Sequence, residues 1–171
     1  EEVQPTDLTA SEISVRLGAT WLPEDVVQEF MYQLLDTPYY AQWKVKVHYS
    51  RYTGGWNVEG KSYDRSNINA ISTYGTDRVN AYKIIEDTLN LRDVRVFDYV
   101  EDENGKRVPI LNKKETAIAQ GKQELIKQAF QDWIWKDQPR RERLCKLYNE
   151  QFNALRPREY DGTHLKFVGM N

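Results

Sequence analysis

The hydrophobic pattern changes its period early in the chain, and this change constrains the fold more than any other feature. Apolar residues recur at helical spacing in residues 24–35, and Pro23 stands at a suitable first helical position. In residues 43–49 apolar and polar residues alternate instead, as in a strand with one buried face. Thr53-Gly54-Gly55 predicts a turn into a returning strand at residues 56–58. A helix followed by an antiparallel hairpin predicts an α+β fold.

Local signals predict three further elements in the first two thirds of the chain. Thr9-Ala10-Ser11-Glu12 has the spacing of a capping box and predicts a short helix over residues 9–18. Thr76 is a suitable cap for a helix over residues 77–90. Asn104-Gly105 between two apolar runs predicts a second hairpin, with strands at residues 94–100 and 107–111. The intervening residues 60–76 are polar and predict a loop with at most one helical turn.

The last third of the chain predicts two helices. Residues 113–136 and 140–155 both carry apolar stripes, and a short link ending in Pro139 separates them. We expect an antiparallel αα-hairpin, followed by an extended connector. The full expectation is an α+β fold with two β-hairpins in a small antiparallel sheet, amphipathic helices and this C-terminal αα-hairpin. Its predicted divisions are residues 1–111, 112–155 and 156–171.

Several classes of protein are excluded by what the sequence lacks. It contains no apolar run long enough to span a membrane and no signal-peptide pattern, so we expect a cytoplasmic protein with no membrane contact. Cys145 is the one cysteine, which rules out an internal disulfide, and two histidines do not assemble a convincing zinc site. Phosphate-binding loops, dinucleotide-binding glycine motifs and nucleophile elbows are also missing. We therefore expect no cofactor and no enzymatic activity in this chain.

Charge is distributed unevenly along the chain. Residues 1–37 have a net charge of −7, whereas residues 113–171 have a net charge of +4. Lysine and arginine neutralise DNA phosphates without reading the base sequence. The candidate nucleic-acid-binding residues are Lys113, Lys114, Lys122, Lys127, Arg140, Arg141, Arg143, Arg156 and Arg158. The alternative is an ordinary charged helix surface, in which these residues pair with neighbouring glutamates.

A second candidate surface is both aromatic and basic. Aromatic rings stack on unpaired bases of any sequence, and nearby cations follow the phosphate backbone. The residues concerned are Tyr39, Tyr40, Trp43, Lys44, Lys46, Tyr49, Arg51, Tyr52 and Trp56. The alternation of residues 43–49, however, places Trp43 and Tyr49 on the apolar side of the strand and predicts that both pack in the core.

One short motif calls for a comparison with base-modifying enzymes. Asp36-Thr37-Pro38-Tyr39 matches three of the four positions of the Asp/Asn-Pro-Pro-Tyr/Phe motif of amino-group DNA methyltransferases, which hold a flipped base there. In this chain the motif follows a helix, Thr37 replaces the first proline, and no glycine-rich cofactor loop precedes it. Helix termination is the better interpretation.

Several stretches taken together resemble a known type of protein. They are residues 8–13, 16–21, 74–76 and 111–117, and above all Arg156-Pro157-Arg158-Glu159-Tyr160-Asp161-Gly162-Thr163-His164 with residues 167–171. This set is similar to the segment between the methyltransferase and SNF2-like, superfamily 2 helicase regions of large DNA methylase/helicase proteins of phages and mobile elements. The resemblance covers nearly the whole chain but carries over no catalytic residue.

The resemblance implies a non-catalytic accessory domain that precedes a helicase motor. Its partners would be the other domains of the parent chain and, through the basic residues, DNA. Three alternatives stay open at this point. The chain is a protein-interaction module whose acidic residues 1–37 dock another domain, or it is a DNA-modifying domain that uses Asp36 and Tyr39. The third is a free-standing regulator encoded by a mobile element.

Overall fold

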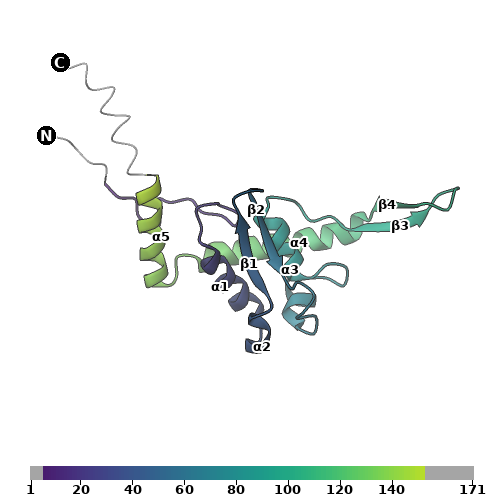
Figure 1. Cartoon of the computed structure of the whole chain (residues 1–171), viewed down its shortest axis with the longest axis horizontal. Helices are drawn as coiled ribbons and strands as arrows, with labels where there is room; N and C mark the ends of the chain where they lie inside the picture. The colour runs from purple at the N-terminus through teal and green to yellow at the C-terminus, as the bar shows by residue number, and fades with distance from the viewer. Residues whose placement is uncertain (1–5, 153–171) are drawn as a thin grey trace, which may run out of the picture. The chain divides into compact units, whose positions relative to one another are not determined.

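The computed structural model describes residues 6–152 and confirms the α+β class (Figure 1). Its elements in chain order are α1 (Glu24–Leu35), α2 (Tyr39–Gln42), β1 (Lys46–Ser50), β2 (Gly55–Glu59), the π-helix η1 (Asn69–Thr73), α3 (Ala81–Leu89), β3 (Phe97–Glu101), β4 (Arg107–Leu111), α4 (Lys113–Trp133) and α5 (Gln138–Gln151). The predicted connector at residues 156–171 lies outside the described residues, and so do Arg156 and Arg158.

The chain divides into two compact units, and the boundaries differ from the predicted ones. The larger unit comprises residues 16–133, and the smaller comprises residues 1–15 and 134–171. α4 therefore belongs with the two hairpins rather than with α5. That α4 and α5 form an antiparallel pair stays a prediction.

Buried polar side chains attach α4 to the rest of the larger unit. Gln123 is buried; its Nε2 donates to Thr88 Oγ1 at 3.0 Å and to Arg92 O at 2.8 Å, and its Oε1 accepts the Val94 N–H at 3.2 Å. Because all the hydrogen-bonding groups of a buried amide need partners, this residue fixes how α4 lies against the end of α3.

Both predicted hairpins form, but they make two separate two-stranded sheets rather than one. β1 pairs with β2 so that Val47 lies opposite Val58 and Tyr49 opposite Trp56. β3 pairs with β4 so that Phe97 lies opposite Leu111. The hairpins stay separate because side chains from helices occupy the outer edges of the first one.

On the β1 side, α1 supplies these side chains. Gln28 Oε1 accepts the Val47 N–H at 3.0 Å, and Glu24 Oε2 accepts the Tyr49 N–H at 2.5 Å. Residues four apart on a helix are about 6 Å apart along its axis, and residues two apart on a strand are about 6.8 Å apart. One face of a helix can therefore satisfy alternate N–H groups of a strand edge.

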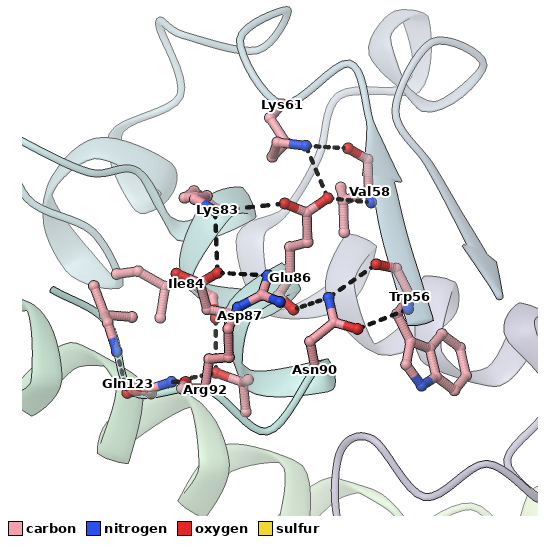
Figure 2. Close-up of polar contacts among 12 residues, drawn as sticks. Trp56, Val58, Lys61, Lys83, Ile84, Glu86, Asp87, Asn90, Arg92 and Gln123 are labelled. Carbon is pink, nitrogen blue, oxygen red and sulfur yellow. Dashed lines mark hydrogen bonds and ion pairs between the residues drawn. The ribbon is translucent and has the colours of Figure 1, made fainter. Parts of the chain in front are cut away.

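On the β2 side, α3 does the same with Glu86 and Asn90 (Figure 2). Glu86 Oε2 accepts the Val58 N–H at 2.9 Å, and Asn90 pairs with both the N–H and the C=O of Trp56, at 2.8 and 2.9 Å. Burial would raise the pKa of Glu86, but hydrogen bonds from Lys61 and Val58 and the nearby lysine charges hold that pKa below its ordinary value. No further strand can pair with either edge of this sheet.

The core of the larger unit lies between α1, α3, α4 and one face of the β1–β2 sheet. Phe30 on α1 and Phe130 on α4 meet edge to face, with their ring centroids 5.2 Å apart. The largest buried apolar side chains of this unit are Phe30, Met31, Leu35, Tyr82, Ile84, Ile85, Leu89, Ile126 and Phe130. α1 and α3 bury most of the apolar stripe seen in the sequence, whereas α4 leaves Ile118 and Leu125 of its stripe exposed. The buried side of α4 is instead Thr116, Ala119, Gln123, Ile126 and Phe130.

The predicted helix over residues 9–18 does not form. The capping-box contact exists, since Glu12 Oε1 accepts the Thr9 N–H at 2.8 Å, but the chain makes only a turn there. In residues 13–17 buried Ile13, Val15 and Leu17 alternate with exposed residues, which is the period of an extended chain. A single helical turn without an apolar stripe does not propagate.

The third helix begins later than predicted. Thr76 Oγ1 accepts the N–H groups of Arg78 and Val79 in a turn, whereas Asn80 caps α3 by accepting the Lys83 N–H at 3.0 Å. Residues 60–76, predicted to be a loop with at most one helical turn, contain the short π-helix η1. Its widened turn is closed by the Tyr74 N–H, which donates to Asn69 O at 2.9 Å.

In the smaller unit, α5 holds the extended N-terminal segment through Asn149. Asn149 Oδ1 accepts the Leu8 N–H at 2.8 Å, and its Nδ2 donates to Leu8 O at 3.0 Å. Asp137 caps α5 by accepting the Arg140 N–H at 3.0 Å. Burial raises the pKa of the Cys145 thiol, which lowers the fraction of reactive thiolate.

Candidate aromatic binding site

Four aromatic side chains and one lysine form an exposed group on the larger unit, here called the aromatic surface. Its members are Tyr39, Tyr40, Trp43, Lys44 and Tyr63. Tyr39 is 90% exposed and Trp43 is 63% exposed. Tryptophan gains much free energy from burial, so a group of rings kept in water points to a binding role.

The path of the chain after α1 explains why these rings face outward. Asp36 ends α1 in the left-handed conformation, and Pro38 precedes the single turn of α2. Tyr39 and Trp43 are four residues apart along this turn and so share one side of it, whereas Ala41 points inward and is fully buried. The small inward residue lets α2 lie close to the core while its large residues stay outside.

Hydrogen bonds from Tyr32 and Gln42 fix this turn. The Tyr32 hydroxyl lies against two carbonyl oxygens, those of Gln42 and Val45, and burial raises the Tyr32 pKa. Gln42 Nε2 in turn donates to Thr37 O at 3.1 Å. The backbone that carries Tyr39, Tyr40 and Trp43 is therefore tied at both of its ends.

A buried polar network joins this turn to the loop that carries Tyr63. The Tyr82 hydroxyl donates to Asp64 Oδ2 at 2.7 Å, and the Thr37 hydroxyl lies 2.7 Å from the same Tyr82 oxygen. Because the one Tyr82 proton goes to Asp64, the Thr37 hydroxyl is the donor to Tyr82. Burial raises the Tyr82 pKa far above its ordinary value, so this hydroxyl stays protonated.

Asn67 extends the network to the end of α1. Its Nδ2 donates to Asp64 Oδ2 at 2.7 Å and to Leu35 O at 2.8 Å. Thr37 and Asp64, which flank the aromatic surface in the sequence, are both almost fully buried. The exposed rings therefore stand on a support whose polar groups are paired with one another.

Gly60 brings the two segments of the surface into direct backbone contact. Its φ is +71°, and a Cβ at this position would lie 2.5 Å from Lys44 O. Only glycine permits this approach without displacement of the backbone. The contact brings the segment that carries Tyr63 close to Lys44.

The cation of the site lies near two rings. Lys44 Nζ is 4.7 Å from the centroid of Trp43 and 5.9 Å from that of Tyr63. A lysine in this position is attracted to each ring by a cation–π interaction and also offers a positive charge at the edge of the aromatic surface. The site can therefore bind a flat ligand by stacking and an anionic group of the same ligand through Lys44.

Only part of the predicted aromatic and basic region comes together here. Trp43 was expected in the core and is exposed, because β1 begins at Lys46 and Trp43 belongs to the turn after α2. Trp56 is buried, and Tyr49 is half-buried against it with ring centroids 5.0 Å apart, so the packing interpretation is right for Trp56 and for part of Tyr49. The fully exposed Tyr52 lies in the β1–β2 turn and is not part of the aromatic surface.

The sequence pattern does not identify Tyr63, because this residue follows the strands in a polar loop. The signal that would have found it is Gly60, since a glycine just after a strand marks a sharp change of direction or a close backbone approach. The predicted members Lys46 and Arg51 lie in β1 and in the β1–β2 turn.

The structure does not gather the predicted lysines of α4 on one side of that helix. Lys113 and Lys114 are exposed in its first turn. Lys122 Nζ donates to Thr73 O at 3.3 Å, and Lys127 pairs with Glu124 at 3.3 Å. At 100° per residue these four positions point in widely different directions. The single basic side expected for this helix is therefore absent from α4.

The predicted arginines of α5 have structural contacts. Arg140 is buried, and its Nε donates to Ile134 O at 3.1 Å. Arg141 Nη1 donates to Trp135 O at 2.8 Å. These bonds satisfy carbonyl groups in the turn before α5. Arg143 is exposed but also has an interaction within the structure. DNA contact by the basic set stays a prediction.

Asp36 and Tyr39 have the arrangement expected for helix termination. Asp36 occupies the C-cap position of α1 with φ 49°, and Thr37 is buried against Tyr82. Across residues 6–152, no group of three His, Cys, Asp or Glu side chains is placed to hold a metal ion. In the same described part of the chain, no helix is both long and apolar enough to cross a bilayer.

Comparison with known proteins identifies one family. Residues 16–154 match the family described as Domain of unknown function (DUF8437). The match includes the whole larger unit and therefore the aromatic surface. No curated protein and no solved structure matches the chain.

Proposed function

The chain belongs to the Domain of unknown function (DUF8437) family, and we propose that it is a non-catalytic accessory domain that binds single-stranded nucleic acid through the aromatic surface. The parent would be a large DNA helicase/methyltransferase protein of the type that the sequence resembles. In such a protein the domain would hold the displaced strand and couple the neighbouring catalytic modules.

The exposure of Trp43 is the observation that carries this proposal. Trp43 is 63% exposed, its neighbour Tyr39 is almost wholly exposed, and Lys44 lies over the ring of Trp43. Bases of single strands stack on such rings with a gain of about 1–3 kcal/mol per base. In a duplex the base faces are already stacked on each other, so the same rings favour unpaired strands.

Lys44 supports nucleic acid over an uncharged flat ligand such as a sugar. Its ammonium group lies among the rings, and no carboxylate pairs with it in the described part of the chain. A cation in this position meets the phosphate that links two stacked bases. Arg65, two residues after Tyr63, is also exposed and adds a second positive charge nearby.

The direct test is fluorescence anisotropy of a labelled oligo-dT with the full chain at low salt. We expect Trp43→Ala to weaken binding by about tenfold, which corresponds to the loss of one stacked base. Tyr52→Ala is the matched control, because Tyr52 is an even more exposed aromatic residue that lies outside the aromatic surface. Equal effects of the two substitutions, or equal affinity for a duplex, would refute the proposal.

The salt dependence tests the role of Lys44 separately. Lys44→Gln should reduce the slope of log K against log salt by about one unit, because one phosphate contact is lost. An unchanged slope would show that Lys44 contacts no phosphate and interacts only with the aromatic rings. The placement in a larger protein is tested by the full reading frame, in which we expect helicase motifs after residue 171.

A further inference from the structure

The β3–β4 hairpin exposes apolar side chains on both of its faces. Tyr99 and Leu111 lie on one face and Val100 and Ile110 on the other, and all four are exposed. The hairpin projects from the N-terminal end of α4 (Figure 1). A two-stranded hairpin is marginally stable in water unless a further strand or a helix packs on it. These faces are therefore suited to being covered.

The register shows which backbone groups point outward. The Asn112 N–H donates to Val96 O and the Asp102 N–H donates to Lys106 O, both at 2.8 Å. Bonded pairs of an antiparallel ladder alternate with non-bonded pairs, so the even-numbered residues of β3 and β4 bond across the hairpin. The odd-numbered residues turn their N–H and C=O groups to the outer edges.

The two outer edges differ in their ability to pair with another strand. On β4, Pro109 occupies an outward position and has no N–H to donate. On β3, Arg78 Nη2 donates to Phe97 O at 3.0 Å and so occupies the near end of the edge. The outward groups of Tyr99 and Glu101 have no hydrogen-bond partner within residues 6–152. This half of β3 is an open edge.

The charges beside the open edge specify a basic partner. Glu101, Asp102 and Glu103 are consecutive acidic residues at the end of β3. The Asp102 carboxylate accepts the N–H groups of Asn104 and Lys106, whereas Glu101 and Glu103 have no ion-pair partner among the described residues. Arg107 lies opposite Glu101 on β4, and its guanidinium is 5.1 Å from the centroid of the Tyr99 ring. The positive charge is thus on β4, and a strand lying along the outer edge of β3 would meet the Tyr99 ring first and the carboxylates of Glu101 and Glu103 near the tip.

We propose that the outer edge of β3 at Tyr99 and Glu101 binds an extended segment of a partner protein by strand addition. The segment carries apolar residues where it faces Tyr99 and Val100 and at least one lysine or arginine where it faces Glu101 and Glu103. Main-chain hydrogen bonds provide the affinity, and these side chains provide the selectivity. The interaction shares no residue with the aromatic surface and does not depend on nucleic-acid binding.

A pair of substitutions at one position tests the main-chain bonds. Tyr99→Ala and Tyr99→Pro both remove the ring, but only proline also removes the outward N–H. The ladder stays intact in both, as it does around Pro109, and slow amide exchange of Asp98 and Val100 checks this. The probe is a short labelled peptide in which valine alternates with lysine and threonine, titrated into the full chain. We expect Tyr99→Pro to bind it about tenfold more weakly than Tyr99→Ala.

Two further peptides and a measurement of the oligomeric state of the chain complete the test. A peptide N-methylated at every second residue, and one with glutamate in place of lysine, should both bind more weakly. The proposal is overturned by equal binding to Tyr99→Pro and Tyr99→Ala, by equal binding of the N-methylated peptide, or by no binding at millimolar peptide. It is also overturned if the chain forms a dimer that Tyr99→Pro dissociates, because a second copy then occupies β3. Oligo-dT binding by Tyr99→Pro should be unchanged, which separates this result from the proposed function.

Discussion

Removal of one buried hydroxyl, in Tyr82→Phe, should destabilise the larger unit and its aromatic surface together. The ring of Tyr82 is fully buried, so phenylalanine fills nearly the same volume and leaves no large cavity. What is lost is the donor to Asp64 and the acceptor for Thr37, both at 2.7 Å. The substitution therefore isolates the hydrogen bonds from the packing.

The magnitude follows from the charge and burial of the partners. A hydrogen bond to a charged group contributes about 1.5–3 kcal/mol, and one between neutral groups contributes about 1 kcal/mol. Asp64 is 3% exposed, so water cannot readily replace Tyr82, although Asn67 still donates to the same carboxylate. We expect the free energy of unfolding to fall by about 3 kcal/mol.

Urea unfolding followed by circular dichroism measures this change, and an unchanged m-value assigns it to stability rather than to the unfolded state. Tyr39→Phe is the matched control; its hydroxyl is in water, and its effect should stay within about 0.5 kcal/mol. Tyr82→Phe should also weaken oligo-dT binding, although Tyr82 is buried beneath the site. If Tyr82→Phe lowers the free energy of unfolding by less than about 1 kcal/mol, which is twice the limit set for the control, the role given to the network is refuted.

Three further substitutions test other contacts. Glu86→Gln should lower the free energy of unfolding at neutral pH by about 1–2 kcal/mol. The folded pKa of Glu86 lies below its ordinary 4.5, so its carboxylate stabilises the fold above pH 4.5 and this stabilisation is lost as the pH falls through the folded pKa. Thermal unfolding of both proteins should therefore differ above pH 4.5 and converge at lower pH. Gly60→Ala should cost about 1–3 kcal/mol in urea unfolding, since its Cβ would meet Lys44 O at 2.5 Å; no loss would mean that the loop moves freely. Asn149→Ala should speed amide exchange at Leu8 while leaving the larger unit unchanged, and protection that persists would contradict the contact.

The sequence predicted those elements whose side chains have a regular period. α1, α4 and α5 follow stripes at helical spacing, and the turns at Gly54 and Asn104-Gly105 mark both hairpins. These features are local, since each depends on residues close together in the chain. The α+β class follows from them without any knowledge of long-range contacts.

Features that depend on distant residues escaped prediction. Trp43 fits the alternation of the following strand, yet the contacts of Tyr32 with Gln42 O and Val45 O place it in a turn. Gln123 looks like a surface residue of an amphipathic helix, but it is buried and determines that α4 belongs with the larger unit. Whether a polar residue such as Gln123 is buried can be predicted only when its hydrogen-bond partners are known.

The two sheets of the larger unit differ in a way that bears on function. Glu24, Gln28, Glu86 and Asn90 occupy outward N–H groups on both edges of β1–β2, so this hairpin serves as a closed support beside the aromatic surface. β3–β4 has one edge blocked by proline and one left open.

Because the aromatic surface and the open β3 edge share no residue or hydrogen bond, their ligands should bind independently. In a variant combining Trp43→Ala with Tyr99→Pro, the loss of oligo-dT affinity should equal that of Trp43→Ala alone, and the loss of peptide affinity should equal that of Tyr99→Pro alone. Coupling above about 0.5 kcal/mol would mean that the two surfaces act as one site.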